Sequence, residues 1–446
     1  MTASTTSSTK PDHVEKLDAE SPPAFGHDMH KLFGFDPSFV NLNHGSYGSL
    51  PLPVRAYCDD LTTKIESNPD KFIRIDCVKY LDTVRERLAK LIGAETDECV
   101  LVPNTSHGVT TVLRNFSFNK EDVLIGTTTT YGSVTQTLKY LADIPPHPTI
   151  STFNLQFPTT HAAIIDSFRE HIRKVIAENP NNGGRKIIAV IDSIASNPGV
   201  LLPWKEMVAI CKEAGVWTVV DAAHSIGQEL DINLSESQPD FWVSNCHKWL
   251  FAKRGCAVLY VPKRNQHLIK SPIPTPMSYH TPRDQWYFGP QTFVNLFEFT
   301  GTIDYVPLLS VTAALDFREW LGGEHKINEY NHNLAVAGGK RLAERLGTSA
   351  MDPDGDLTLN MVNVELPLPD LIRNHWIVHK ILANTLLLEK NAYAAHYMHN
   401  GKWWARCSAQ IWNEISDFDV IADALKDACA KVVEYAEQMK QQQANQ

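Results

Sequence analysis

Short runs of apolar residues recur along the first 260 positions, and they alternate with segments in which apolar residues return every three or four positions. The runs are typical of buried strands, and the spaced pattern is typical of amphipathic helices. The sequence predicts seven strands, at residues 99–103, 122–127, 150–155, 186–193, 217–223, 241–245 and 256–261. It predicts helices at 80–92, 107–116, 133–141, 161–176 and 204–214. This alternation indicates a mainly parallel sheet covered by helices on both faces.

The pattern changes after residue 262. A stretch rich in proline and aromatic residues covers 271–290, a long helix is predicted near 307–321, and the remainder mixes helical segments with a few strands. The predicted fold class is therefore α/β, with a doubly wound seven-stranded sheet and a smaller C-terminal α+β domain. The predicted parts are a flexible tail at 1–32, a large domain at 33–303, a small domain at 304–438 and a disordered tail at 439–446.

Composition and charge limit the classes of partner that we expect this protein to bind. The formal net charge of −10 argues against nucleic acid and anionic membranes. The eight cysteines are scattered without a C-x-x-C pair, which indicates reduced thiols rather than a disulfide framework or a metal site. No apolar run approaches the length that spans a membrane. The first 21 residues combine serine and threonine with several acids, unlike a signal peptide or a mitochondrial presequence, so the expected location is the cytoplasm.

Ligands of open parallel sheets bind beyond the carboxyl ends of the strands, and two ionisable residues fall there. Asp221 ends an apolar strand, where a buried carboxylate needs a cationic partner such as a protonated pyridine nitrogen. The alternative is an aspartate that caps the next helix. Lys248 follows the next strand, between His247 and Trp249, and apolar surroundings of this kind lower a lysine pKa. Together, Asp221 and Lys248 predict a site for pyridoxal 5′-phosphate (PLP).

Three further segments could complete such a site. Thr105 and Ser106 join the first strand to a helix, whose N-terminus suits a phosphate, although a simple helix cap is the alternative. Tyr131 follows the second strand, where it could cover the cofactor ring or donate a proton, or merely pack. Arg406 interrupts an apolar run and needs a carboxylate partner, either from a substrate or from an internal salt bridge.

Taken together, these residues resemble class V of the fold-type I PLP enzymes, the group of cysteine desulfurases and isopenicillin N epimerase-like proteins, over about residues 33–436. The resemblance implies that Lys248 binds the cofactor as a Schiff base and that Asp221 binds the pyridine nitrogen. It places Tyr131 over the ring and Arg406 on the substrate carboxylate. It implies a homodimer with shared active sites, because a turn reaches the phosphate of the neighbouring subunit. The implied cofactor-binding residues also include Thr105, Ser106, Ser196, His224, Asn245, His247 and, in that turn, Thr302.

Within class V, the segments at 42–48, 244–251, 254–261, 264–269 and 405–410 resemble the fungal-type hercynylcysteine sulfoxide lyases of ergothioneine biosynthesis. His224 departs from that group, which tends to have glutamine at this position, whereas epimerase-like relatives can have histidine. The candidates for contact with the amino-acid substrate are Asn43, His44, Tyr47 and His399, although packing or structural hydrogen bonding is an alternative for them.

The available side chains favour a β-elimination. A desulfurase needs a nucleophilic cysteine on a loop shortly before the carboxylate-binding arginine, and residues 391–404 contain none. Lys248 would remove the α-proton and Tyr131 would protonate the leaving group, which gives ergothioneine through its sulfenic acid, with pyruvate and ammonia. The alternatives are another class V reaction on an amino acid, such as epimerisation, other lyase chemistry or C–C bond formation. A non-catalytic nucleotide-binding protein lacks support, because no G-x-G-x-x-G follows the first strand.

Overall fold

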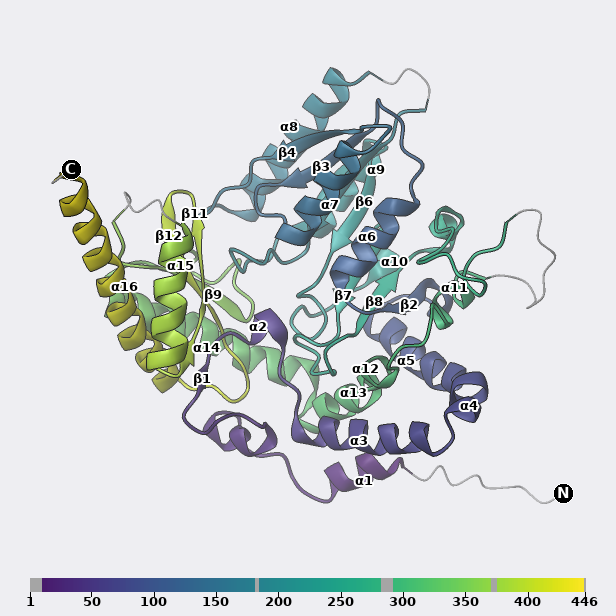
Figure 1. Cartoon of the computed structure of the whole chain (residues 1–446), viewed down its shortest axis with the longest axis horizontal. Coiled ribbons are helices and arrows are strands. Elements are labelled where there is room, and N and C mark those ends of the chain that lie inside the picture. The colour runs from purple at the N-terminus through teal and green to yellow at the C-terminus, as the bar shows by residue number, and fades with distance from the viewer. Residues whose placement is uncertain (1–9, 181–183, 282–291, 370–374, 445–446) are drawn as a thin grey trace.

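The computed structural model describes residues 10–180, 184–281, 292–369 and 375–444. Its central element is a seven-stranded sheet with the order β2-β8-β7-β6-β5-β3-β4, in which β8 alone runs antiparallel to its neighbours. All seven predicted strands are confirmed (Figure 1): β2 (Cys99–Val102), β3 (Val123–Thr127), β4 (Thr149–Phe153), β5 (Ile187–Asp192), β6 (Trp217–Asp221), β7 (Phe241–Asn245) and β8 (Ala257–Tyr260).

Alternate residues of each strand face opposite apolar cores. In β5, Ile187, Ala189 and Ile191 join one core, while Ile188 and Val190 join the other. The first core contains helices α5 (Cys77–Ile92), α8 (His161–Glu178) and α9 (Trp204–Glu213), and the second contains α6 (Thr105–Asn115) and α7 (Gly132–Asp143). Because both strand faces are buried, the strands read as continuous apolar runs. The five predicted helices are confirmed, with ends shifted by up to three residues.

A smaller unit lies beside this sheet, to the left in Figure 1. Its antiparallel sheet has the order β11-β12-β9, and a separate apolar core joins this sheet to its helices. A short N-terminal strand pairs in parallel with β10 and ties the N-terminal arm to this unit. The elements are β1 (Val40–Asn41), β9 (Met361–Glu365), β10 (Ala392–Tyr393), β11 (Ala395–His399), β12 (Lys402–Ser408), α14 (Gly323–Leu346), α15 (His375–Asn384), η5 (Thr385–Glu389) and α16 (Ile415–Ala444).

The remaining elements connect or cover these two units. They are α1 (Asp12–Asp18), η1 (His27–Leu32), α2 (His44–Tyr47), α3 (Leu52–Ser67), α4 (Pro69–Lys71), η2 (Phe72–Asp76), η3 (Thr96–Glu98), α10 (Leu234–Ser237), η4 (Lys263–Leu268), α11 (Asn295–Glu298), α12 (Val306–Leu309) and α13 (Val311–Trp320). In the described ranges, no helix has both the length and the apolar character that a membrane crossing requires.

The structure differs from the predicted helix at 307–321, which is divided at Ser310 into α12 and α13. The Ser310 hydroxyl donates to the carbonyl of Pro307 and accepts from the amide of Lys253, so a side chain competes with the regular helical pattern. Both helices pack in the same core as α5, and their apolar side chains therefore belong with the large sheet rather than with the C-terminal unit.

The predicted tails also differ from what the structure shows within the described residues. Residues 12–32, which we assigned to a flexible tail, contain α1 and η1, and Leu17 and Met29 are buried in the main core. The composition of this segment is polar, but these two apolar side chains provide its attachment. At the other end, α16 continues to Ala444, into the predicted disordered tail. Residues 1–9 and 445–446 lie outside the described part of the chain.

Candidate active site

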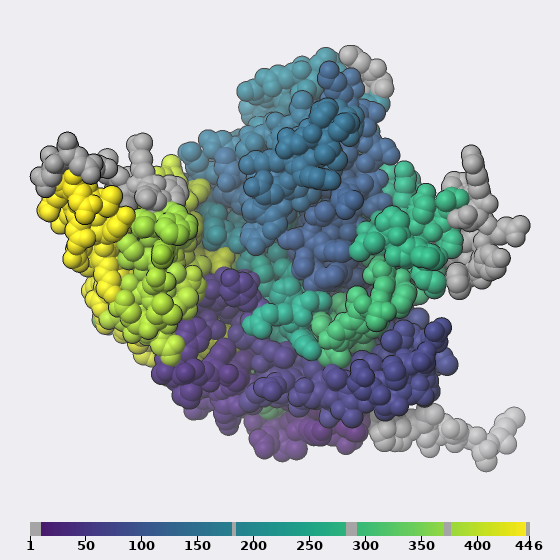
Figure 2. All heavy atoms as spheres, viewed as in Figure 1, coloured from purple at the N-terminus to yellow at the C-terminus, as the bar shows by residue number. Residues whose placement is uncertain are grey.

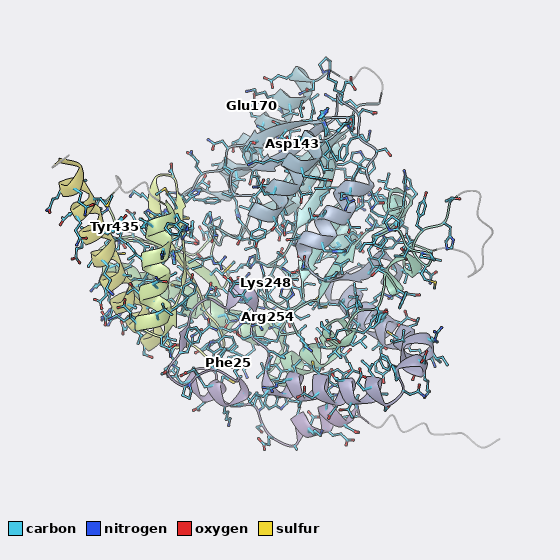
Figure 3. All side chains as sticks on the ribbon, viewed as in Figure 1. Phe25, Asp143, Glu170, Lys248, Arg254 and Tyr435 are labelled. Atoms are coloured by element: carbon cyan, nitrogen blue, oxygen red, sulfur yellow. The ribbon has the colours of Figure 1, made fainter. Side chains whose placement is uncertain are left out.

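Lys248 lies near the centre of the molecule, between the large sheet and the C-terminal unit (Figure 3). It follows β7, and its Nζ atom is 3.0 Å from Nε2 of His224 in the loop after β6. Burial lowers the pKa of Lys248 to about 7, with a further lowering by the positive charge of Arg406. An amine with this pKa is about half deprotonated at neutral pH, so a large share of it can act as a nucleophile or base.

Asp221 is the last residue of β6, and its carboxyl is buried. Its Oδ1 atom accepts a hydrogen bond from the amide of Ala223 at 3.1 Å, and no described helix begins there, which removes the helix-cap alternative. Burial raises the pKa of Asp221, whereas the charge of Lys248 lowers it. A buried carboxylate with this limited set of partners fits a protonated pyridine nitrogen.

The start of α6 has the donors that a phosphate requires. The amide of Thr105 donates to Oδ1 of Asn245 at 2.9 Å, while the Thr105 hydroxyl is buried without a hydrogen-bond partner among the described residues. The side chain of Asn104 caps α6 by accepting from the amide of His107. Gly108 permits close packing of α6 on β7, since a Cβ there would lie 2.6 Å from Cγ1 of Val243. Thr105 and Asn245, two of the predicted phosphate-side residues, are thus brought together at the N-terminus of α6.

His247 and Ser106 complete this region. Nδ1 of His247 donates to the carbonyl of Cys256 at 2.9 Å, and burial lowers the pKa of His247 to about 4. Ser106 is the second residue of α6, directly after Thr105. The loop of the N-terminal arm approaches the same turn: Gly48 has a φ of +69°, and a Cβ there would lie 1.7 Å from the carbonyl oxygen of His247. Only glycine fits this approach.

Arg406 on β12 is buried and has only neutral partners. Its Nη1 donates to the carbonyl oxygen of Ser196 at 2.6 Å, and its Nη2 donates to Oγ of Ser46 at 2.9 Å and, at 3.4 Å, to Oδ1 of Asn43. The hydrogen bonds that the guanidinium makes to described residues all go to neutral groups, and none goes to a carboxylate. The internal salt bridge that we considered is therefore wrong for the described residues, and the site suits the carboxylate of a ligand.

The other candidates have different surroundings. Tyr131 precedes α7 and is 48% exposed, and Tyr47 is 70% exposed. The ring of His44 is buried against Trp249, Phe251 and Trp412. In Figure 2, the surface is recessed between the yellow-green C-terminal elements and the blue helices of the sheet, with the purple segment that contains α2 at its lower edge.

His399 and Thr302 are among the predicted residues that no described contact joins to the Lys248 cluster. Nε2 of His399 accepts a hydrogen bond from the amide of Phe157 at 2.9 Å, which links β11 to a loop of the large sheet. Thr302 is exposed and lines a groove beside α5, together with Cys77 and Met277. Within a single chain, His399 thus has a structural contact, and Thr302 lies on a surface away from the Lys248 cluster.

The sequence analysis missed two residues of this region. Asp192 ends β5 as the register partner of Asp221, and its buried Oδ2 atom has no hydrogen-bond partner among the described residues. Trp249, already named as a neighbour of Lys248, donates from Nε1 to Nδ1 of His224 at 3.3 Å. An acid at the carboxyl end of a neighbouring apolar strand was the available signal for Asp192. The contact of Trp249 with the site had no signal in the sequence.

Comparison with known proteins identifies the family to which this chain belongs. The family described as Aminotransferase class-V matches residues 73–370. The chain belongs to the class V aminotransferase family. Among similar proteins, the L-cysteine desulfhydrase-like protein lolT1 of Epichloe uncinata is 35% identical over 92% of this chain and 97% of that protein. The hercynylcysteine sulfoxide lyase of Schizosaccharomyces pombe is 31% identical over 91% of this chain and 98% of its own length.

The fold agrees with this class V assignment. A cysteine desulfurase structure from Thermococcus onnurineus superposes with a TM-score of 0.71 at 17% identity, covering 92% of this chain and all of that one. The chain therefore has the fold-type I architecture of PLP enzymes, as predicted, and its cofactor is PLP. The residues present fit this group: Lys248 offers an amine, Asp221 a carboxylate and Thr105 an unpaired buried hydroxyl. This class V protein is a PLP-dependent enzyme.

Proposed function

We propose that this enzyme is a C–S lyase that cleaves hercynylcysteine sulfoxide by β-elimination. The observation that carries the proposal is the buried guanidinium of Arg406, which has no described carboxylate partner and whose charge lowers the pKa of Lys248. A ligand carboxylate on Arg406 would hold an α-amino acid beside the lysine amine. The site thus supports chemistry at the α-carbon of an amino acid.

PLP, when bound, withdraws electrons from the α-carbon and so makes its proton removable. Asp221 supports this by keeping a positive charge on the ring nitrogen. Lys248 accepts the α-proton, since its low pKa leaves a large share of the amine neutral at neutral pH. Arg406 fixes the carboxylate and, with it, the direction in which the α-proton points.

The elimination breaks the bond between the β-carbon and sulfur. The electrons of the departing α-proton form the Cα–Cβ double bond, and the sulfur leaves as a sulfenate that takes up a proton. We propose Tyr131 as the donor, because it follows β3 at the carboxyl edge of the sheet and is exposed to solvent. The released aminoacrylate reacts with water to give pyruvate and ammonia, and two equivalents of thiol reduce the sulfenic acid to ergothioneine.

Persulfide chemistry has no suitable group in this chain. All eight cysteines are buried. Cys407, directly after Arg406, has a pKa raised to about 12 by burial. A thiol that remains protonated inside a core is a poor nucleophile. This favours elimination over transfer of sulfur to a cysteine of the enzyme.

The choice of substrate is supported by the relative from S. pombe, which is named a hercynylcysteine sulfoxide lyase and matches nearly end to end. A second candidate, elimination of hydrogen sulfide from L-cysteine, is favoured by the relative lolT1, which is named L-cysteine desulfhydrase-like. Both reactions use the same residues up to departure of the sulfur group. The size and charge of the leaving group distinguish them.

The test is incubation of the purified enzyme with hercynylcysteine sulfoxide and a thiol, followed by mass spectrometry. Ergothioneine and pyruvate in equal amounts are expected, and neither should form with Lys248→Ala, which should also lose the yellow colour of the cofactor. A parallel reaction with L-cysteine measures sulfide. If sulfide forms quickly and ergothioneine does not form, the second candidate replaces the first. If neither product forms, the C–S lyase assignment is wrong.

We further propose that the enzyme acts as a homodimer in the cytoplasm. Thr302 lies on a groove of about 690 Å³ next to α5. Apolar side chains on or near this groove are exposed, including Ile75, Val78 and Ile303. An exposed apolar area of this kind fits a second copy of the chain, which would bring Thr302 to the partner's cofactor phosphate. Sedimentation of the wild type and of Val78→Glu would test this, with loss of the dimer expected for the variant.

A further inference from the structure

Three side chains form a connected line at the cofactor lysine. The indole Nε1 of Trp249 lies 3.3 Å from Nδ1 of His224, and Nε2 of the same imidazole lies 3.0 Å from Nζ of Lys248. Trp249 and His224 are both buried. Water therefore has little access to either ring nitrogen, and the hydrogen-bonding roles within the line must be satisfied by these three groups.

The roles follow from the chemistry of the groups. The indole N–H can only donate, so Nδ1 of His224 must accept and carries no proton. A neutral imidazole has one proton, which is then on Nε2. Nε2–H consequently donates toward Nζ of Lys248, and the amine must accept through its lone pair. An ammonium has no lone pair, so a charged Lys248 would face an N–H donor instead of an acceptor.

We propose that Trp249 fixes His224 as its Nε2–H tautomer, and that His224 thereby holds Lys248 in its neutral, proton-accepting form. Trp249 and His224 are positioning residues for the lysine. Trp249, the residue that follows the lysine, thus acts on Lys248 through its hydrogen bond to His224.

The charged and titratable groups around the amine agree with this assignment. Arg406 lowers the pKa of Lys248 by its positive charge, and the carboxylate of Asp221 opposes it. His224 and His247 have pKa values lowered by burial and add no positive charge at neutral pH. His44, from the N-terminal arm, is likewise neutral, with a pKa lowered to about 3 by burial.

A buried arginine, Arg318, holds the backbone on both sides of this line of side chains. Arg318 on α13 donates to the carbonyl of Trp249 at 2.8 Å and to the carbonyl of Gly227 at 3.0 Å. Its guanidinium is buried and pairs with Glu324 at 2.5 Å. Arg318 thus joins the segment that contains Trp249 to the loop that contains His224. This link fixes the distance across which the indole and the imidazole meet.

The test measures the pH dependence of cofactor capture by the full-length chain after removal of PLP. Capture requires the neutral amine, so its rate rises with pH through the lysine pKa. In Trp249→Phe, Nδ1 loses its donor, the Nδ1–H tautomer becomes accessible, and Nε2 can accept from an ammonium. The midpoint should move by about one unit to higher pH, with roughly tenfold slower capture below the midpoint.

Matched variants separate this effect from loss of a buried indole. Trp204 is also buried and donates to Glu229 at 2.8 Å, and no described hydrogen bond joins it to His224 or Lys248, so Trp204→Phe should keep the wild-type midpoint. His224→Gln should keep it as well, because an amide can accept from Trp249 and donate to Lys248. His224→Met should behave like Trp249→Phe. If Trp249→Phe and Trp204→Phe have the same midpoint, the proposal is wrong.

A spectroscopic measurement on the wild-type enzyme tests the proposal even if one of the Trp249 or Trp204 variants fails to fold. Nitrogen-15 NMR of histidine-labelled wild-type enzyme distinguishes the two neutral tautomers by the shifts of the ring nitrogens. The His224 signals, assigned by their absence in His224→Gln, should show protonated Nε2 and unprotonated Nδ1. The opposite pattern in the wild type would overturn the proposal, whatever the rate of elimination.

Discussion

Asp192 and Asp221 face each other as register partners at the carboxyl ends of the adjacent parallel strands β5 and β6, and both carboxyls are buried. Register partners in a parallel sheet project from the same face, so the two acids are neighbours. Burial and the charge of Asp221 raise the pKa of Asp192 well above its ordinary value. Two such carboxyls do not both ionise, and Asp192 is the one that retains its proton, which leaves Asp221 as the predicted partner of the pyridine nitrogen.

We therefore expect Asp192→Asn to gain stability relative to the wild type as the pH rises. The folded state holds a proton on Asp192 that the unfolded state releases above about pH 4, so wild-type stability falls between that pH and the raised pKa. Asparagine removes this pH dependence, so the slope of the free energy of unfolding against pH should change by up to about 1.4 kcal/mol per pH unit. Urea unfolding of the cofactor-free chain at several pH values measures it. Asp143→Asn, at an exposed position on α7, is the control. Parallel curves for Asp192→Asn and wild type would contradict the expectation.

Replacement of Arg406 by methionine should lower kcat/KM for the amino-acid substrate by roughly 10²-fold or more. The reason is the loss of charge-assisted hydrogen bonds to the carboxylate, worth about 1.5–3 kcal/mol each. The decisive comparison uses the amide of the same substrate, for which wild type and variant should differ little. Arg341→Met removes an exposed arginine that pairs with Asp419 and serves as the control. An equal loss for acid and amide would show that Arg406 does not bind the carboxylate.

Tyr131→Phe should lower the rate of elimination by about 10²-fold, the usual contribution of a positioned proton donor. The effect should shrink for a substrate whose leaving group departs without protonation. Stopped-flow measurement of pyruvate release gives the rate, and Tyr140→Phe, at another exposed tyrosine, on the helix α7 that follows Tyr131, is the matched control. Retention of the wild-type rate in Tyr131→Phe would remove Tyr131 from the mechanism.

His44→Phe should make the enzyme less sensitive to acid. Burial lowers the pKa of His44 to about 3, so below about pH 6.5 the unfolded state binds a proton that the folded state does not. Wild-type stability therefore falls as the pH decreases from about 6.5 toward 3. Phenylalanine fits among Trp249, Phe251 and Trp412 without this penalty, and the slope should decrease by up to about 1.4 kcal/mol per pH unit. Urea unfolding between pH 4 and 7 measures it, with His325→Phe at an exposed position as the control; an unchanged slope would contradict the expectation.

The local pattern of apolar residues was sufficient to predict the strands of the large sheet. Strands such as β5 are buried on both faces, so each has a continuous apolar run that is recognisable without knowledge of its neighbours. The same logic placed Asp221 and Lys248 at the carboxyl edge of the sheet, because the ends of consecutive parallel strands must meet there. The position of Ser310 and the attachment of Leu17 and Met29 were not predictable in this way, since they depend on contacts with distant segments.

The sequence by itself determined the fold class and the cofactor, and it predicted Lys248 as the lysine that binds it, because these depend on strand ends and on residues close to them in the chain. Only the tertiary structure decided which groups surround that lysine. The partners of Arg406 come from residues 43, 46 and 196, and the acid beside Asp221 comes from another strand. The hydrogen bond between Trp249 and His224 depends on how two loops pack. Such pairings are set by strand register and by the closure of long loops, and neither leaves a periodic signal in the sequence.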